Sequence, residues 1–99
     1  CLPKLIITCS AGIEPGKIIK YAPIVDEALS LTSKLENAAD LPRLVTNRAE
    51  PHRDESLLER AEYHDYDKLM SKQDWPIAEC VNLPSTHELY ILYTSGTTG

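Results

Sequence analysis

The sequence predicts an α/β fold, with a mostly parallel sheet and flanking helices, over its 99 residues. Short apolar runs rich in β-branched residues alternate with segments of helical periodicity, in the order strand, helix, strand, helix, strand. This alternation is typical of layered folds with a parallel sheet. The last strand-like run leads into a loop of hydroxyl residues and glycines, and ligands of such sheets lie beyond the carboxyl ends of the strands. The pattern therefore predicts a binding loop near the end of the chain.

The first strand is predicted over residues 4–11 (KLIITCSA), a β-branched run between Pro3 and Gly12. Residues 12–17 contain two glycines and a proline and are predicted to form a loop. Residues 18–21 are predicted to form a short extended piece.

The clearest helix is predicted over residues 23–35. Pro23 suits a first helical turn because its missing N–H would have no intrahelical partner there. Asp26 and Glu27 would lie near the positive end of the helix dipole. The expected apolar face follows the spacing i, i+4, i+7, i+11 and consists of Ile24, Ala28, Leu31 and Leu35, widened by Val25 and Leu29.

The second half of the chain has weaker signals. Residues 41–46 are predicted to form a second strand, and residues 47–54 a loop. Helical periodicity extends over residues 55–72, and a break into two helices is predicted at residues 65–67. Residues 73–88 contain two prolines and are expected to be irregular.

The last strand is predicted over residues 88–93, which are apolar without alternation, as in a strand covered on both faces. The loop that follows has a composition suited to phosphate, because glycines bring backbone N–H groups close to an anion and hydroxyls add donors. Its members are Thr94, Ser95, Gly96, Thr97, Thr98 and Gly99. A phosphate loop is normally followed by a helix or a basic residue, so we expect the chain to be a fragment, truncated at both ends, of a larger protein.

Two common nucleotide motifs do not fit this loop. The P-loop pattern G-x-x-x-x-G-K-S/T fails because Gly96 and Gly99 are three residues apart and no lysine is present. The dinucleotide pattern G-x-G-x-x-G also fails. On composition alone, a surface loop that binds no ligand remains an equal alternative.

The sequence resembles the adenylate-forming (AMP-binding) enzymes: acyl-CoA synthetases, luciferases and peptide synthetase adenylation domains. Residues 93–99 (YTSGTTG) are similar to the phosphate-binding motif of that family, which continues with Pro, Lys and Gly. Several other segments resemble short-chain acyl-CoA synthetases of the acetyl- and propionyl-CoA synthetase type. These segments are residues 4–7, 12–17, 21–29, 65–70 and 88–93, and the resemblance departs at residues 50–62, which look longer and more charged.

The resemblance implies that residues 1–99 are part of the large N-terminal domain of an AMP-forming acyl-CoA ligase. Such an enzyme uses ATP, Mg²⁺ and CoA: a carboxylate such as acetate or propionate attacks the α-phosphate of ATP, and the CoA thiol then displaces AMP. Thr94, Ser95, Gly96, Thr97, Thr98 and Gly99 would hold the β- and γ-phosphates. No catalytic residue is predicted within these 99 residues, and the isolated chain is expected to be inactive.

Lys17 is a second candidate by the same resemblance, because the family's loop after the first strand lies near the CoA nucleotide. Glu14 stands where related enzymes often carry another basic residue. A solvated surface lysine remains the alternative for Lys17.

Composition argues against several other classes of protein and of site. The net charge of −5 disfavours a nucleic-acid surface, and no apolar run approaches the ~18 residues of a membrane span. Cys1, Cys9 and Cys80 form no C-x-x-C pair, so neither a disulfide framework nor a zinc site is expected, and Cys9 is expected to be a buried, inert thiol. The three histidines lack metal spacing, and Trp75 is expected to be a packing anchor.

Two functions of different classes remain. The first is a short-chain acyl-CoA ligase with small-molecule substrates, located in the cytoplasm or the mitochondrial matrix. The second is a standalone α/β module that binds a phosphate ligand or a partner without catalysis. Acyl chain length and oligomeric state are not predicted.

Overall fold

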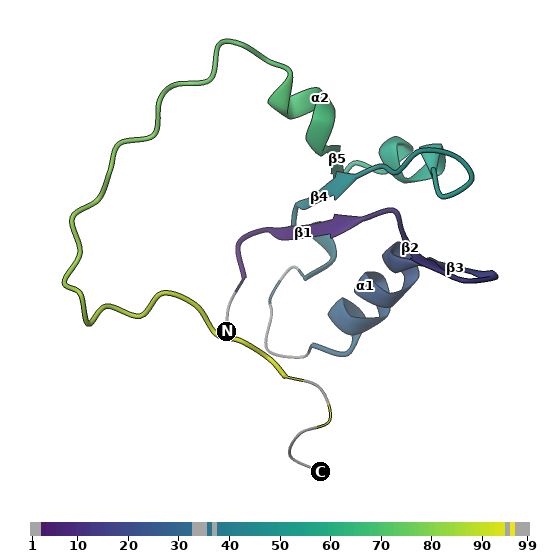
Figure 1. Cartoon of the computed structure of the whole chain (residues 1–99), viewed down its shortest axis with the longest axis horizontal. Helices are drawn as coiled ribbons and strands as arrows, with labels where there is room; N and C mark the ends of the chain where they lie inside the picture. The colour runs from purple at the N-terminus through teal and green to yellow at the C-terminus, as the bar shows by residue number, and fades with distance from the viewer. Residues whose placement is uncertain (1–2, 33–35, 37, 95, 97–99) are drawn as a thin grey trace.

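The computed structural model describes residues 3–32, 36, 38–94 and 96. A three-stranded parallel sheet with helices forms the body of the molecule, and an antiparallel hairpin extends from it (Figure 1). The elements are β1 (Ile6–Cys9), β2 (Ala11–Glu14), β3 (Lys17–Lys20), α1 (Tyr21–Ser30), β4 (Arg43–Thr46), β5 (Tyr63–Asp65) and α2 (Tyr66–Met70), with 3₁₀ turns at Ala38–Asp40 and Glu55–Glu59. The predicted α/β class and the parallel sheet are therefore confirmed.

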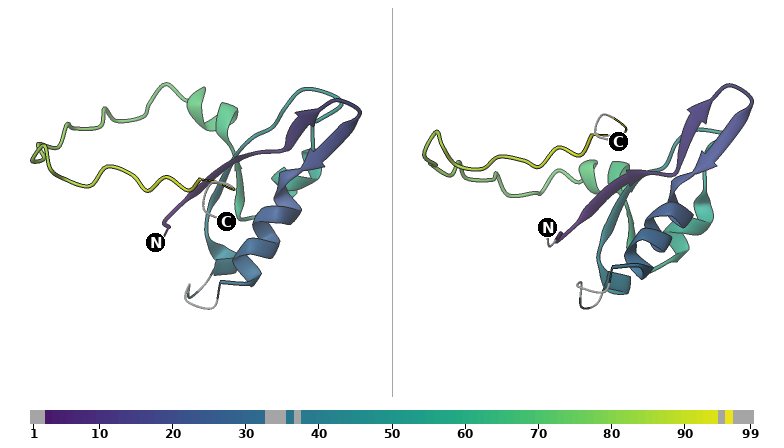
Figure 2. Two further views of the ribbon diagram at one scale, coloured as in Figure 1. Left: turned by 60° about the horizontal axis from the view of Figure 1, so that its bottom comes forward. Right: turned by 90° about the horizontal axis from the view of Figure 1, so that it is seen from below.

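The sheet has the strand order β1-β4-β5, with both neighbouring pairs parallel. Arg43 of β4 stands opposite Ile6 on one side and Tyr63 on the other. The helix α1 lies in the connection from β1 to β4 and packs alongside the sheet (Figure 2). Because parallel strands need such crossovers, the β–α–β order expected from the sequence follows directly.

The small core lies between α1, the sheet and the turn at Glu55–Glu59. Val45, in the middle of the central strand, is completely buried. Ala22, Leu57 and Tyr63 are buried around it, and Leu58 packs against them. The four buried residues of this cluster come from four different elements, so the cluster holds the helix, the sheet and the turn together.

The loop predicted over residues 12–17 was wrong, because these residues belong to a β-hairpin. β2 and β3 pair antiparallel, with Glu14 opposite Lys17 across a two-residue turn. Gly16 has a φ of 70°, which the second central position of a type II turn requires, and Pro15 suits the first. The proline and glycine residues indicated the position of the turn correctly, but the residues on either side of the turn form strands.

Gly12 in this hairpin leaves room for the Tyr21 ring. A Cβ at Gly12 would lie 2.5 Å from Tyr21 Oη and 2.9 Å from Cζ. We expect Gly12→Ala to lower the free energy of unfolding by about 1–3 kcal/mol, because the ring must move. Urea unfolding checks this, and the cost should shrink in a Tyr21→Leu background, which lacks the clashing atoms. An equal cost in both backgrounds would contradict the steric explanation.

The apolar face predicted for the first helix is correct at Leu29 and wrong at Ile24 and Leu31, and Leu35 lies outside the described residues. α1 begins at Tyr21 and ends at Ser30, and its buried residues are Ala22 and Leu29. Ile24 and Leu31, assigned to the core, are 54% and 77% exposed. The stripe that faces the sheet consists of the buried Ala22 and Leu29 and the half-buried Asp26, at i, i+7 and i+4. The charge at its centre concealed it from a hydrophobicity pattern.

The expected dipole arrangement of this helix was also wrong. Because α1 starts at Tyr21, its first turn contains no acidic residue. Asp26 and Glu27 lie beyond that turn, where the favourable effect of the helix N-terminus has largely faded. Pro23 does lie in the first turn, as predicted.

The long helical segment predicted over residues 55–72 is divided. A 3₁₀ turn spans Glu55–Glu59, the short strand β5 spans Tyr63–Asp65, and α2 follows at once. Asp65 caps α2, since its Oδ1 accepts a hydrogen bond of 3.0 Å from the Lys68 backbone N–H. The predicted interruption at residues 65–67 is thus the start of α2, whereas the strand before it was missed.

Trp75 lies at the end of α2. Its Nε1 donates a 2.7 Å hydrogen bond to the Leu69 carbonyl, and the Lys72 ammonium lies 5.4 Å from the ring centroid. Trp75 is nevertheless 54% exposed, so the expected role as a packing anchor is met only in part.

The strand predicted over residues 88–93 was wrong in this structure. The segment has no regular secondary structure, and Figure 1 shows it as part of an extended trace. Its large side chains are all exposed: Leu89, Tyr90, Ile91, Leu92 and Tyr93. A strand needs a partner for its backbone groups, and within the described residues no β-ladder includes this segment. The irregular stretch predicted before it is confirmed.

The helices in the described part of the chain are all too short or too polar to cross a bilayer.

Candidate functional site

The predicted phosphate loop is described at two positions, Thr94 and Gly96. Gly96 has a φ of 74°, which favours glycine, and a Cβ there would meet no atom of the described residues within 4 Å. Thr94 is exposed. Ser95, Thr97, Thr98 and Gly99 lie outside the described residues, so the grouping of the six around a phosphate stays a prediction.

Lys17 begins β3 at the turn of the hairpin, where its side chain is exposed. Glu14 stands opposite it in the register, so a carboxylate and an ammonium share the tip of the hairpin. Figure 1 shows this hairpin extending away from the sheet. Lys17 is therefore accessible, and the structure brings it to no other predicted site residue within the described part of the chain.

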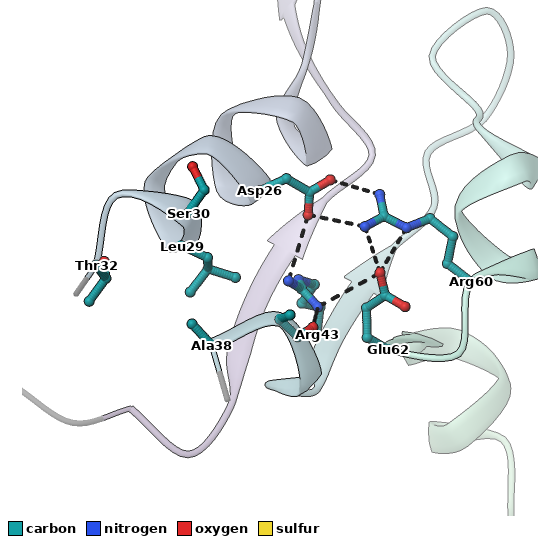
Figure 3. A pocket seen from close by; sticks show the side chains of 9 residues that line it. Asp26, Leu29, Ser30, Thr32, Ala38, Arg43, Arg60 and Glu62 are labelled. Atoms are coloured by element: carbon teal, nitrogen blue, oxygen red, sulfur yellow. Dashed lines mark hydrogen bonds and ion pairs between the residues drawn. The ribbon is translucent and has the colours of Figure 1, made fainter. Parts of the chain in front are cut away.

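The densest cluster of charges lies between α1 and the sheet, and sequence reasoning missed it (Figure 3). Arg60 holds Asp26 of α1 through two hydrogen bonds, of 2.7 and 3.3 Å. It also donates to Glu62 Oε1, at 2.8 Å from Nε. Arg43 lies 3.7 Å from Asp26 and 3.9 Å from Glu62. We call these four residues the charge cluster.

Arg43 is the buried member of the charge cluster, with 2% of its surface exposed. Its Nη1 donates hydrogen bonds of 2.9 and 3.2 Å to the carbonyls of Ala39 and Leu41. Its guanidinium also lies 5.3 Å from the centre of the Tyr63 ring. A buried arginine in a strand reads in the sequence as an interruption of the apolar run, which is why its structural role was not predicted.

The charge cluster shifts the titration of its members. Hydrogen bonding to Arg60 lowers the pKa of Asp26 below its usual 3.8, against the opposing effect of burial, and a hydrogen bond of 3.2 Å from Tyr63 Oη adds to the lowering. Backbone hydrogen bonding and Arg60 lower the pKa of Glu62 as well. Burial raises the pKa of Tyr63, and Asp26 raises it further. The charge cluster thus stabilises the ionised form of its two carboxylates.

A pH dependence of stability follows from these shifts. A carboxyl group whose pKa is lowered on folding contributes stability above its unfolded pKa, and that contribution disappears as the pH falls through the folded value. We therefore expect the free energy of unfolding to fall as the pH drops below about 4. In Asp26→Asn this acid-induced loss should be smaller. Urea unfolding between pH 7 and pH 3 checks this, and identical profiles for both proteins would contradict it.

The charge cluster lines a hollow of about 540 Å³ together with Leu29, Ser30, Thr32, Ala38 and Ala39. Two guanidinium groups face two carboxylates there, so the formal charges cancel. Each side chain is already bound to another member of the cluster. This arrangement attaches α1 to the sheet and leaves no charge free for a ligand.

Thiols and potential metal ligands are scattered. Cys9 is half-buried rather than fully buried as expected, Cys80 is exposed, and both are free thiols. Among the described residues, no three His, Cys, Asp or Glu side chains lie close enough to hold a metal ion.

Comparison with known proteins shows clear similarity to one group of enzymes. The chain is 45% identical over 97 residues to acyl-CoA synthetase short-chain family member 3, mitochondrial, of Bos taurus, which covers 98% of the chain and 13% of that protein. The protein of the same name from Homo sapiens is 40% identical over the same shares. An acetyl-coenzyme A synthetase of Methylobacillus flagellatus is 36% identical, covering 97% of the chain and 14% of that protein. No family model and no solved structure matches.

Proposed function

Since this chain belongs to the short-chain acyl-CoA synthetase family, of whose members it spans about 13% in length, we propose that it is part of an AMP-forming acetate- or propionate-CoA ligase. The observation that supports this most is the 45% identity to a short-chain acyl-CoA synthetase over 98% of the chain. Residues 1–99 would form part of the large N-terminal, AMP-binding domain. By analogy with the named relatives, the enzyme would act in the mitochondrial matrix or the cytoplasm.

The proposed reaction has two steps. The carboxylate of acetate or propionate attacks the α-phosphate of ATP, which yields acyl-AMP and releases pyrophosphate. The CoA thiol then attacks the acyl carbon and releases AMP. The leaving pyrophosphate carries high negative charge, so donors already aimed at its oxygens lower the barrier of the first step.

The loop of residues 94–99 would supply these donors through hydroxyl and backbone N–H groups. The left-handed backbone of Gly96, with open space around it, supports this assignment, because an anion can approach such a position closely. Mg²⁺ bound with ATP would neutralise part of the phosphate charge. The chain would supply these phosphate donors, and the adenine, ribose and carboxylate sites would lie elsewhere in the enzyme, so residues 1–99 alone should show no ligase activity.

The full-length protein tests this function. We expect it to form acyl-CoA from ATP, CoA and acetate or propionate, and to exchange labelled pyrophosphate into ATP when the carboxylate alone is added. Residues 1–99 alone serve as the negative control. A full-length protein that binds ATP but supports neither reaction with any short-chain carboxylate would instead favour the non-catalytic binding module.

Lys17 is proposed to contact a phosphate of CoA. Lys17→Ala in the full-length enzyme should raise the KM for CoA several-fold and leave pyrophosphate exchange unchanged, because CoA enters only in the second step. The effect should weaken at high salt, since salt screens exposed charges. Dephospho-CoA, which lacks the 3′-phosphate, should be used almost equally by both proteins.

Lys4→Ala is the matched control for this experiment, because Lys4 is exposed and lies before the sheet. It should change no kinetic constant. An unchanged KM for CoA in Lys17→Ala would return Lys17 to the role of a solvated surface residue.

A further inference from the structure

Arg48 differs from the other arginines of the chain. Arg43, Arg53 and Arg60 each form ion pairs with carboxylates. Arg48 forms none among the described residues. Its Nε is buried without a hydrogen-bond partner there, a feature that it shares with Arg43. Within the described part of the chain, its side chain donates one hydrogen bond, a weak one of 4.0 Å from Nη2 to Cys9 Sγ. An arginine left unpaired in a partly buried position is costly unless something else binds it.

Arg48 lies at the edge of the sheet where ligands are expected. It lies two residues after β4, at the carboxyl end of the parallel sheet, which is where ligands of such sheets bind. Its backbone N–H donates a 3.0 Å hydrogen bond to Ser10 Oγ, at the corresponding end of β1. Ser10 is 1% exposed and itself donates to the His52 carbonyl at 2.8 Å. The residue is therefore fixed against the ends of two adjacent strands.

The segment around Arg48 is held from its other side as well. The Asn47 side chain accepts from the Asp54 backbone N–H at 2.9 Å and donates to the Asp54 carbonyl at 3.2 Å. Lys20, the last residue of the hairpin, pairs with Asp54 at 3.1 Å. These bonds connect the hairpin, β4 and the segment after it. They therefore hold the backbone around Arg48 in place.

A hollow of about 570 Å³ lies between the hairpin and this segment. Arg48 lines it together with Ile13 of the hairpin and Thr46, Asn47, Ala49, Glu50, Pro51 and His52. Among the described residues that line it, Glu50 is the one carboxylate, and no ion pair joins Glu50 to Arg48. The planar guanidinium matches the geometry of a phosphate group, which it can bind through two N–H donors.

We propose that Arg48 binds a phosphate group of a nucleotide substrate in this hollow. The inference rests on the proposed ligase function for the identity of the substrate. CoA is the favoured source of the phosphate, because the hairpin that forms one wall of the hollow also carries Lys17. ATP is the other source with the same chemistry.

The test uses Arg48→Gln and Arg48→Lys in the full-length protein. We expect Arg48→Gln to weaken the binding of adenosine 3′,5′-bisphosphate, the nucleotide part of CoA, by at least ten-fold in calorimetry. Arg48→Lys should retain part of the affinity, because it keeps the charge and loses the two-pronged geometry. Arg53→Gln is the control, since the exposed Arg53 already pairs with Glu55, and Glu50→Gln should strengthen binding or leave it unchanged.

The kinetic constants identify the source. A higher KM for CoA with normal pyrophosphate exchange would assign the phosphate to CoA, and a higher KM for ATP would assign it to ATP. Unchanged affinity for adenosine 3′,5′-bisphosphate and for Mg·ATP in folded Arg48→Gln and Arg48→Lys would overturn the proposal. Because direct binding is measured, a protein that lacks ligase activity but loses nucleotide affinity in Arg48→Gln would refute the proposed function and still support the phosphate site.

Discussion

Replacing Thr97 by valine in the full-length enzyme should slow carboxylate-dependent pyrophosphate exchange by about 10²–10³-fold, if residues 94–99 hold the leaving phosphates. Removing a single donor aimed at developing negative charge typically costs this much. Valine keeps the branched shape of threonine, so the loss would come from the hydroxyl. Thr97→Ser, which keeps the hydroxyl, should recover most of the rate.

Thr86→Val is the matched control, because Thr86 is exposed and lies outside the proposed loop. It should leave the exchange rate unchanged. A Thr97→Val enzyme with the normal exchange rate would exclude a role for this hydroxyl in adenylate formation. The loop would then bind phosphate through its backbone or not at all.

Replacing Arg43 by leucine should produce the largest loss of stability of any substitution considered for this chain. The change removes the buried cation of the charge cluster and leaves the carbonyls of Ala39 and Leu41 without their donor. Breaking a buried ion pair from one side typically costs about 3–5 kcal/mol. Urea unfolding of the full-length protein, followed by circular dichroism, measures the loss.

Arg60→Leu is the natural comparison for this experiment. Arg60 makes the shorter bonds of the charge cluster, yet its side chain is 40% exposed, and exposed ion pairs contribute about 0–1 kcal/mol. We therefore expect Arg60→Leu to cost much less than Arg43→Leu. Equal losses would show that bond length, and not burial, determines the contribution of each arginine.

The sequence predicted those elements whose cause is local. The strand around residues 43–46 follows from a short run that contains Leu44, Val45 and Thr46 between turn signals, and the turn at Gly16 follows from the Pro-Gly pair. The bounds of α1 were only partly predicted. Its buried face was predicted only at Leu29, because the rest depends on the position of the sheet and on the pairing of Asp26 with two distant arginines. No periodicity can show that a charged residue belongs to the packed side of a helix.

The predictions for β5 and for residues 88–93 were both wrong, and for the same reason. β5 is a strand that was not predicted, and residues 88–93 are a predicted strand that does not form in the described part of the chain. β5 has only three residues and weak strand propensity, yet it pairs with β4 and buries Tyr63. Residues 88–93 have high strand propensity and no β-ladder within the described residues. Strand propensity mainly reflects packing against neighbours, so pairing overrides it in both cases.

The residues of the candidate site also differ in whether the sequence alone could identify them. The glycine-and-hydroxyl loop and Lys17 were identified because they carry a motif that resembles one in a known family. Arg48 and the charge cluster were not identified, since each has a function only in relation to groups far away in the sequence. The lack of an ion-pair partner for Arg48 among the described residues is recognisable only once the partners of the other three arginines are known.

The order of strands in the sheet has a consequence for how the chain acquires its structure during synthesis. The central strand β4 pairs with residues 37 positions before it (Ile6 with Arg43) and 20 positions after it (Arg43 with Tyr63). Such distant pairings are slow, because the intervening chain must close a loop first. The hairpin β2–β3 needs no such closure and can form within microseconds. As the chain leaves the ribosome, β4 can join β1 as soon as α1 has folded, and β5 then adds to the free side of β4, so that the sheet grows in the order in which its strands are made.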